Sequence, residues 1–261
     1  MTKMLAQRIL TALVGIPIVL VALYYGGFFW LIVVSCLILV GLLEFARLSG
    51  GGAYLDYLLL AGLSFLVVTY SGINGTKLLI WLVAQLFYYL LRASFGGMCN
   101  FAAAFNILGV LYVALPLSFL WNVRAVFGLS WTVFGLLTTW VTDTGAYFGG
   151  THCGRRQLAP TISPNKSVEG ALFGSAAALV FGFIFAQVTH KPAFSVSGLA
   201  LLLSILAQLG DLVESALKRE QAVKDTGRLL PGHGGILDRF DSLGFVFPAL
   251  YIILNLLPPN F

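Results

Sequence analysis

The chain has 261 residues, of which 59% are hydrophobic and 10% are charged, and its mean hydropathy is +0.94. Soluble domains carry about 25% charged residues, so these charges are too few to cover a water-soluble globule, and composition predicts one polytopic membrane domain. The net charge of +5 resides in a few loops without a basic run between exposed aromatics, which argues against nucleic-acid binding. The three cysteines form no C-x-x-C pair, which excludes a disulfide scaffold.

A helix needs about 20 apolar residues to cross the hydrocarbon core of a bilayer, and nine apolar runs approach that length. Backbone amides in lipid must be hydrogen-bonded internally, so an all-α membrane fold is expected. No small-residue cleavage site follows the first run, which is therefore interpreted as an uncleaved helix. The predicted spans are 9–25, 28–43, 54–70, 78–91, 101–120, 129–148, 170–188, 194–210 and 243–257.

The positive charges predict the orientation of these nine spans. If the N-terminus is cytoplasmic, twelve of the fifteen Lys and Arg residues fall on the cytoplasmic side, as the positive-inside rule favours. The C-terminus then lies on the opposite side. We divide the chain into an N-terminal region of about five spans (1–128) and a C-terminal catalytic region (129–261). The catalytic region contains two cytoplasmic loops, 149–169 and 211–242.

The loop 211–242 carries the clearest chemical pattern. It begins with helical spacing, in which Asp211, Ser215 and Lys218 fall on one face. Carboxylates beside Lys and Arg suit a magnesium-bound polyphosphate, because Mg²⁺ takes carboxylate and phosphate oxygens and the cations neutralise the remaining phosphate charge. An ordinary solvated loop with charge pairs is the alternative, but carboxylates at membrane-adjacent helix ends are costly and commonly functional.

The second half of this loop contains a helix break and a short helix. Pro231 and three glycines interrupt the helix, and the Gly-His-Gly-Gly run 232–235 leaves bare amides that a phosphate can approach. Asp238 and Asp241 then share one face of the next predicted helix.

Residues 215–241 read S-x-L-K-R-x4-K-D-x-G-x2-L-P-x-H-G-G-I-x-D-R-F-D. This pattern resembles the signature of phosphatidate cytidylyltransferases (CDP-diacylglycerol synthases). The loop 163–170, SPNKSVEG, is similar to the second motif of that family, with Ser167 where threonine is commoner. The resemblance is strong from Trp140 to Phe247 and weak over the first half. The sequence HCGRR at 152–156 departs from the family pattern, so no role is carried onto His152 or Cys153.

The resemblance implies that CTP and phosphatidate react to give CDP-diacylglycerol and pyrophosphate in phospholipid biosynthesis. The lipid phosphate has a second pKa near ~6 and is mostly dianionic at neutral pH, so it needs no general base. The site must instead bring two polyanions together and neutralise their charge. The carboxylates are therefore assigned to Mg²⁺, with Asp211 and Asp238 as first ligands and Asp241 next, and a second cation is left open.

The expected catalytic residues are Asp211, Asp238, Lys218 and Arg219. The residues expected to bind substrate are Ser163, Asn165, Lys166, Ser215, Lys224, His233, Gly234, Gly235, Arg239 and Asp143. His233 lies between glycines and is equally compatible with loop packing. Asp143 lies inside a predicted span and is expected to line the same site, with the metal or the cytidine as its partner. Glu44 and Arg47 are expected to be structural.

Three alternatives remain. A CDP-alcohol phosphotransferase would carry D-G-x2-A-R followed by D-x3-D, which this chain lacks, and the signature disfavours a CTP-dependent polyprenol or dolichol kinase. An ion-coupled transporter with Asp143 as a relay would be expected to show an internal repeat. The resemblance and the lack of a long N-terminal extension favour the bacterial inner membrane, with the active site facing the cytoplasm. The expected partners are CTP, phosphatidate and membrane lipid, without nucleic acid, and a homodimer is left open.

Overall fold

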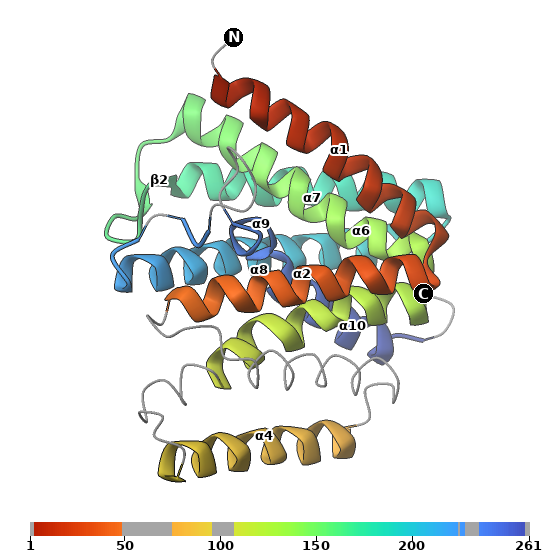
Figure 1. The fold of residues 1–261 in the computed structure, drawn as a ribbon. Helices are drawn as coiled ribbons and strands as arrows, with labels where there is room; N and C mark the ends of the chain where they lie inside the picture. Colours follow the sequence, from red (N-terminus) through yellow and green to blue (C-terminus); the bar gives the residue numbers. More distant parts are fainter. Residues whose placement is uncertain (1–2, 49–74, 96–106, 224, 228–234, 259–261) are drawn as a thin grey trace. The chain divides into compact units, whose positions relative to one another are not determined.

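The computed structural model describes residues 3–48, 75–95, 107–223, 225–227 and 235–258 (Figure 1). The elements in chain order are α1 (Lys3–Tyr25), α2 (Gly27–Leu48), α4 (Gly75–Phe95), η1 (Val110–Ala114), α6 (Leu115–Cys153), β1 (Gln157–Ala159), β2 (Ser163–Ser167), α7 (Val168–Thr189), α8 (Ala193–Glu220), α9 (Leu237–Phe240) and α10 (Leu243–Leu256). The chain divides into two compact units. Unit 1 comprises Met1–Val126 and Val223–Arg239, and unit 2 comprises Phe127–Ala222 and Phe240–Phe261.

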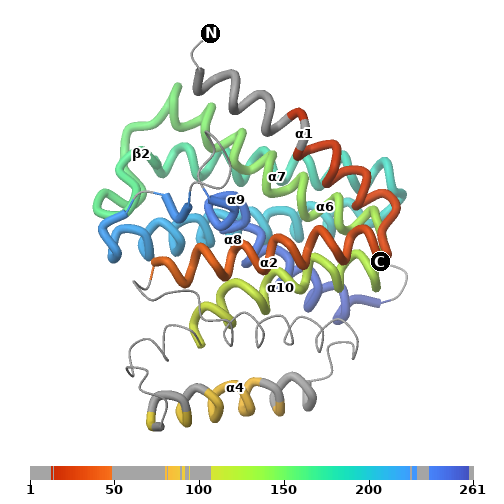
Figure 2. Tube along the Cα trace, viewed as in Figure 1, coloured from red at the N-terminus to blue at the C-terminus, as the bar shows by residue number. Residues whose placement is uncertain are grey.

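The regular secondary structure of the described residues is helical apart from one short hairpin, which confirms the helical prediction, and the coils of the helices can be followed in the trace (Figure 2). Four described helices are long and apolar enough to cross a membrane, namely Gly27–Leu48, Ile107–Cys153, Val168–Thr189 and Ala193–Glu220. Two shorter apolar helices are Gly15–Tyr25 and Leu243–Leu256. The predicted span 54–70 lies outside the described residues, so the count of nine spans and their orientation stay predictions.

The helical stretch Ile107–Cys153 contains 47 residues and is interrupted at Gly128. A continuous helix of that length would extend about 70 Å at 1.5 Å per residue, more than twice the ~30 Å hydrocarbon core. Gly128 has φ 84° and ψ −171°, a backbone conformation that only glycine adopts readily. The interruption lies in the connection expected between the predicted spans 101–120 and 129–148.

The core of unit 1 is one face of α2 packed on η1 and the following helical turns. Trp30, Val34, Ile38, Leu42 and Phe45 recur every three or four positions and are buried, as helical periodicity requires of one face. The indole Nε1 of Trp30 donates to the Leu120 carbonyl at 3.1 Å, which satisfies its polar atom inside this core. The same helix carries Glu44 at its buried C-terminal end.

Unit 2 is built around α7, whose buried residues are small and spaced four apart: Gly170, Gly174, Ala178, Gly182 and Ala186. Small residues let helices approach closely within a membrane protein. A Cβ added at Gly182 would lie 2.7 Å from the Ala200 Cβ of α8, and one at Gly174 would lie 2.7 Å from the Thr142 carbonyl oxygen of α6. The stripe therefore brings α6 and α8 directly against α7, while α8 also contacts α10.

The polar loop expected at 149–169 contains an antiparallel β-hairpin, which the sequence analysis did not predict. Strands β1 and β2 pair with Gln157 opposite Ser167 and Ala159 opposite Ser163. The Ser167 hydroxyl then accepts a hydrogen bond from the Gly170 amide at 3.1 Å and caps α7. Because β2 runs directly into α7, the hairpin fixes where Asn165 and Lys166 lie relative to that helix.

Candidate functional site

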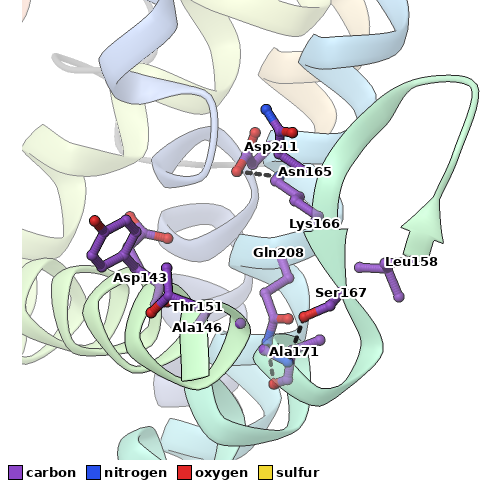
Figure 3. A pocket seen from close by; sticks show the side chains of 13 residues that line it. Asp143, Ala146, Thr151, Leu158, Asn165, Lys166, Ser167, Ala171, Gln208 and Asp211 are labelled. Atoms are coloured by element: carbon purple, nitrogen blue, oxygen red, sulfur yellow. Dashed lines mark hydrogen bonds and ion pairs between the residues drawn. The ribbon is translucent and has the colours of Figure 1, made fainter. Parts of the chain in front are cut away.

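The described part of unit 2 contains a pocket of about 420 Å³ beside the hairpin (Figure 3). Its wall comes from α6, both strands, the first turn of α7 and the middle of α8. The lining residues are Asp143, Ala146, Tyr147, Gly150, Thr151, Leu158, Asn165, Lys166, Ser167, Gly170, Ala171, Gln208 and Asp211. Pockets of this volume accommodate small molecules or headgroups. Four of the residues predicted from the sequence, Asp143, Asn165, Lys166 and Asp211, are thus brought to one pocket.

An ion pair joins residues of the two loops predicted at 149–169 and 211–242 within this pocket. The Lys166 ammonium of β2 contacts the Asp211 carboxylate of α8, and their side chains are 30% and 32% exposed (Figure 3). The Ser215 hydroxyl, one turn further along α8, donates to Asp211 Oδ1 at 3.5 Å. A partly exposed ion pair is only weakly stabilising, so a phosphate can displace the carboxylate from Lys166 at little cost.

Gln208 and Asp143 complete the polar lining. The Gln208 amide nitrogen donates to the Ser175 hydroxyl at 3.1 Å and to the Ser204 hydroxyl at 3.3 Å, which fixes the side chain between α7 and α8. Asp143 is exposed on α6 and lies across the pocket from Lys166 in Figure 3. The pocket therefore presents a carboxylate on α6 opposite a cation on β2.

Asp241 follows α9 in unit 2 and lies beside the C-terminal half of α8. Its carboxylate oxygen Oδ1 accepts a hydrogen bond from the Ser242 amide at 2.6 Å. Burial, followed by the negative charge of Asp211, raises the pKa of Asp241 above the usual range of a carboxyl group. Gly210 permits this approach, because a Cβ there would lie 2.8 Å from the Asp241 carbonyl oxygen. Asp211 and Asp241, both predicted metal ligands, are thus electrostatic neighbours.

The two signature cations at the end of α8 have different surroundings. Lys218 is 13% exposed at its side chain, and its ammonium lies 3.2 Å from the Glu214 carboxylate, itself nearly buried. Arg219 is exposed, and its Nε donates to the Ile162 carbonyl at 3.3 Å, which ties the end of α8 to the hairpin turn. Arg219 is therefore the more accessible of the two to a phosphate.

The remaining signature residues belong to unit 1. The Asp238 carboxylate accepts hydrogen bonds from the Gly235 amide at 2.7 Å and from the Thr226 amide at 3.1 Å, and the neighbouring Arg239 is exposed. The prediction that Asp238 and Asp241 share a helix face is wrong in detail, because α9 ends at Phe240. Asp211 and Asp238 fall in different units, so their convergence stays a prediction. Lys224, His233 and Gly234 lie outside the described residues.

Ser163 is placed in the hairpin, opposite Ala159, and does not line this pocket. The pocket also contains residues that sequence reasoning missed: Gln208, Tyr147 and Thr151. Gln208 precedes Asp211 by one helical turn, and Tyr147 and Thr151 follow Asp143 by one and two turns. Helical spacing from the two carboxylates would have found all three.

The carboxylates fit a Mg²⁺ ion that is held partly by substrate phosphates, rather than one enclosed by protein ligands alone. Within the described ranges, no three Asp, Glu, His or Cys side chains form a group that could hold a metal by protein alone. Mg²⁺ commonly keeps waters and takes one or two carboxylates together with substrate phosphates. Asp211 already holds one cation, the Lys166 ammonium, so a donor set of one or two carboxylates is compatible with a metal that arrives with a nucleotide.

Comparison with known proteins identifies the family of the chain. A sequence profile described as "Cytidylyltransferase family" matches residues 6–257, nearly the whole chain. The chain belongs to the cytidylyltransferase family. This match also extends over the first half, where the motifs gave only a weak resemblance.

Curated relatives of this cytidylyltransferase include two named phosphatidate cytidylyltransferases. The protein of Bacillus subtilis (strain 168) is 47% identical over 156 residues, which cover 58% of either chain. The protein of Staphylococcus aureus (strain COL) is 45% identical over 154 residues, which cover 58% of this chain and 59% of the relative. The chain thus matches somewhat less than three fifths of the length of these relatives.

Proposed function

We propose that this cytidylyltransferase is a phosphatidate cytidylyltransferase, which converts CTP and phosphatidate into CDP-diacylglycerol and pyrophosphate. The observation that carries the proposal is the 47% identity to the Bacillus subtilis enzyme of that name. The pocket supports it, because a carboxylate–lysine pair lies where β2 and the first turn of α7 meet α8, and α7 and α8 are apolar helices long enough to cross a membrane. A site at a membrane surface suits a substrate with a lipid tail and a phosphate headgroup.

The reaction would proceed by attack of a lipid phosphate oxygen on the α-phosphorus of CTP. One P–O bond forms to the lipid phosphate as the P–O bond to the departing pyrophosphate breaks. The lipid phosphate is already largely dianionic near neutral pH, so no side chain has to remove a proton. The protein has to align two polyanions and neutralise their charge.

The proposed roles divide between cations and carboxylates. Lys166 and Arg219 hold phosphate oxygens by charge-assisted hydrogen bonds. Lys218 contributes its positive charge from its position beside Glu214. Asp211, Asp238 and Asp241 would hold Mg²⁺, which when bound neutralises phosphate charge as other phosphoryl-transfer enzymes require. The remaining substrate contacts are assigned to Ser163, Asn165, Ser215, Lys224, His233, Gly234, Gly235, Arg239 and Asp143.

The membrane arrangement proposed is nine spans with a cytoplasmic N-terminus and a site facing the cytoplasm. It is supported by the distribution of Lys and Arg residues. The four long apolar helices are compatible with it. The bacterial inner (plasma) membrane is the proposed location, because the relatives named above come from bacteria.

Two labelled nucleotides test the reaction. Purified protein in mixed micelles would receive CTP labelled at either the α- or the γ-phosphorus, together with phosphatidate, with a polyprenol or dolichol, or with no lipid acceptor. The proposal expects the α-label to enter the lipid phase only when phosphatidate is present, while the γ-label leaves as pyrophosphate. Transfer of the γ-label to a polyprenol or dolichol, with release of CDP, would instead identify a lipid kinase.

A further inference from the structure

Glu44 near the C-terminal end of α2 is a buried carboxylate that accepts hydrogen bonds from both ends of residues 226–237, here called the signature segment. Its side chain is 1% exposed. Oxygen Oε1 accepts from the Ile236 amide at 3.0 Å, and Oε2 accepts from the Leu237 amide at 2.9 Å. The hydroxyl of Thr226 donates to Oε2 at 3.4 Å. One side chain from the N-terminal spans thus binds both ends of the stretch 226–237.

The segment is shaped to admit this carboxylate. A Cβ added at Gly227 would lie 2.4 Å from Glu44 Oε1, and a Cβ added at Gly235 would lie 2.5 Å from Oε2. Any side chain at these two positions would push the carboxylate away. Burying a carboxylate is costly unless its charge is compensated by hydrogen bonds, and the three donors supply them. Removing the acceptor would leave one buried and one partly buried amide without their partner.

The groups bound by Glu44 are the neighbours of those bound by Asp238. The Asp238 carboxylate accepts from the amides of Gly235 and Thr226. Glu44 accepts from the hydroxyl of the same Thr226 and from the amide that follows Gly235. The orientation of Asp238 therefore depends on a stretch of backbone that Glu44 holds on its other side.

We propose that Glu44 is a positioning residue for the signature segment, which it holds so that Asp238 is oriented for the metal and Arg239 for the nucleotide phosphates. Glu44 itself touches neither substrate nor metal. The kinetic part of the inference rests on the proposed function, whereas the anchoring part concerns only hydrogen bonds within the chain. Groups that orient metal ligands typically change metal affinity or activity about 10–100-fold when they are removed.

The test uses the 261-residue chain in detergent with Glu44→Gln, which keeps the side-chain volume but loses one acceptor. Glu220→Gln is the matched control, because Glu220 is an exposed carboxylate at the end of α8. Hydrogen exchange of the peptide that contains Ile236 and Leu237 is measured without substrates. We expect faster exchange in Glu44→Gln, with the control unchanged. We also expect kcat per folded molecule to fall about tenfold or more and the Mg²⁺ concentration for half-maximal activity to rise.

A merely structural role would give a different result. It would reduce the yield of folded protein, while the folded molecules kept normal kcat and normal Mg²⁺ dependence. That result, or unchanged exchange in Glu44→Gln, would overturn the inference. Glu44→Asp keeps both carboxylate oxygens and should recover part of the lost activity.

Two further comparisons separate a failure of the Glu44 inference from a folding defect and from a failure of the proposed function. If Glu44→Gln does not fold, Thr226→Val takes its place, because it removes only one donor to Glu44. Unchanged hydrogen exchange at Ile236 and Leu237 in Thr226→Val would then count against the inference. If the wild-type protein does not convert CTP and phosphatidate, the proposed function fails, while the exchange measurement still decides whether Glu44 anchors the segment.

Discussion

Lys166 of β2 and Asp211 of α8 form an ion pair that connects the hairpin to α8 in one pocket. Each residue was expected to bind a different ligand, the lysine a phosphate and the aspartate a metal. Their pairing shows how the pocket balances charge without either ligand. In the proposed mechanism, a nucleotide that arrives with its metal would replace both partners at once, because the phosphate would bind the lysine and the metal would bind the aspartate.

The first prediction concerns this lysine. Lys166→Ala should reduce kcat/KM by about 10–150-fold, because a charge-assisted hydrogen bond to phosphate contributes about 1.5–3 kcal/mol. Steady-state kinetics with varied CTP and phosphatidate would measure the loss. Lys191→Ala is the control, since Lys191 lies near the ring of Trp131 at the other end of α7. Kinetics of Lys166→Ala that match those of the control would assign phosphate binding to other cations.

The second prediction concerns the metal. Activity should require Mg²⁺ or Mn²⁺, and Asp211→Asn should abolish it because the amide lacks the charge that holds a cation. Asp238→Asn should do the same. A Mg²⁺ titration of the wild type and both variants at two pH values would separate this role from proton transfer, which would follow a carboxylate titration. Full activity in EDTA would contradict the assignment.

The third prediction concerns packing of α7 on α8. Gly182→Ala should lower the free energy of unfolding by about 1–3 kcal/mol, because the new methyl group collides with Ala200 and overpacks the contact. Gly198→Ala of α8 meets nothing within 4 Å and should be neutral or stabilising, as alanine favours helices over glycine. Thermal unfolding in detergent compares the two. Equal midpoints would mean that α7 and α8 do not pack this closely.

The fourth prediction concerns orientation. The charge distribution puts position 224 in the cytoplasm and position 191 outside. Single cysteines at these positions, in a variant without the three native cysteines, should react with an impermeant thiol reagent from opposite sides of the membrane. Right-side-out and inverted vesicles provide the comparison. Labelling of both positions from one side would refute the model of nine spans.

The sequence predicted the structure correctly where residue spacing along one helix determines which side chains meet. Asp211 and Ser215 were expected on one face of a helix, and the two side chains indeed meet on α8. The apolar runs likewise located α2, α7 and α8, because burial in lipid leaves few alternatives to a helix. The motif around Lys166 was recognised from its residues alone, and the structure brings that lysine to Asp211.

Other features depended on contacts between distant segments and could not be found from local pattern. The hairpin at 157–167 contains two prolines and lacks the alternation of apolar and polar residues typical of a strand, so its local sequence did not predict pairing. Glu44 follows an apolar span and was expected to be structural, but its partners lie almost two hundred positions away. Only the fold reveals that the N-terminal spans contribute to the signature segment.

Segment 223–239 belongs to the same compact unit as the first 126 residues, although it lies between two parts of the other unit in the chain. Excision of the C-terminal region at Gly128 would therefore leave Thr226, Ile236 and Leu237 without the carboxylate that binds them. Such a fragment would contain both motifs recognised in the sequence, but it would lack Glu44, the acceptor that binds residues of the second motif. Activity from a split protein would then require both pieces to be produced together and to reassociate in the membrane.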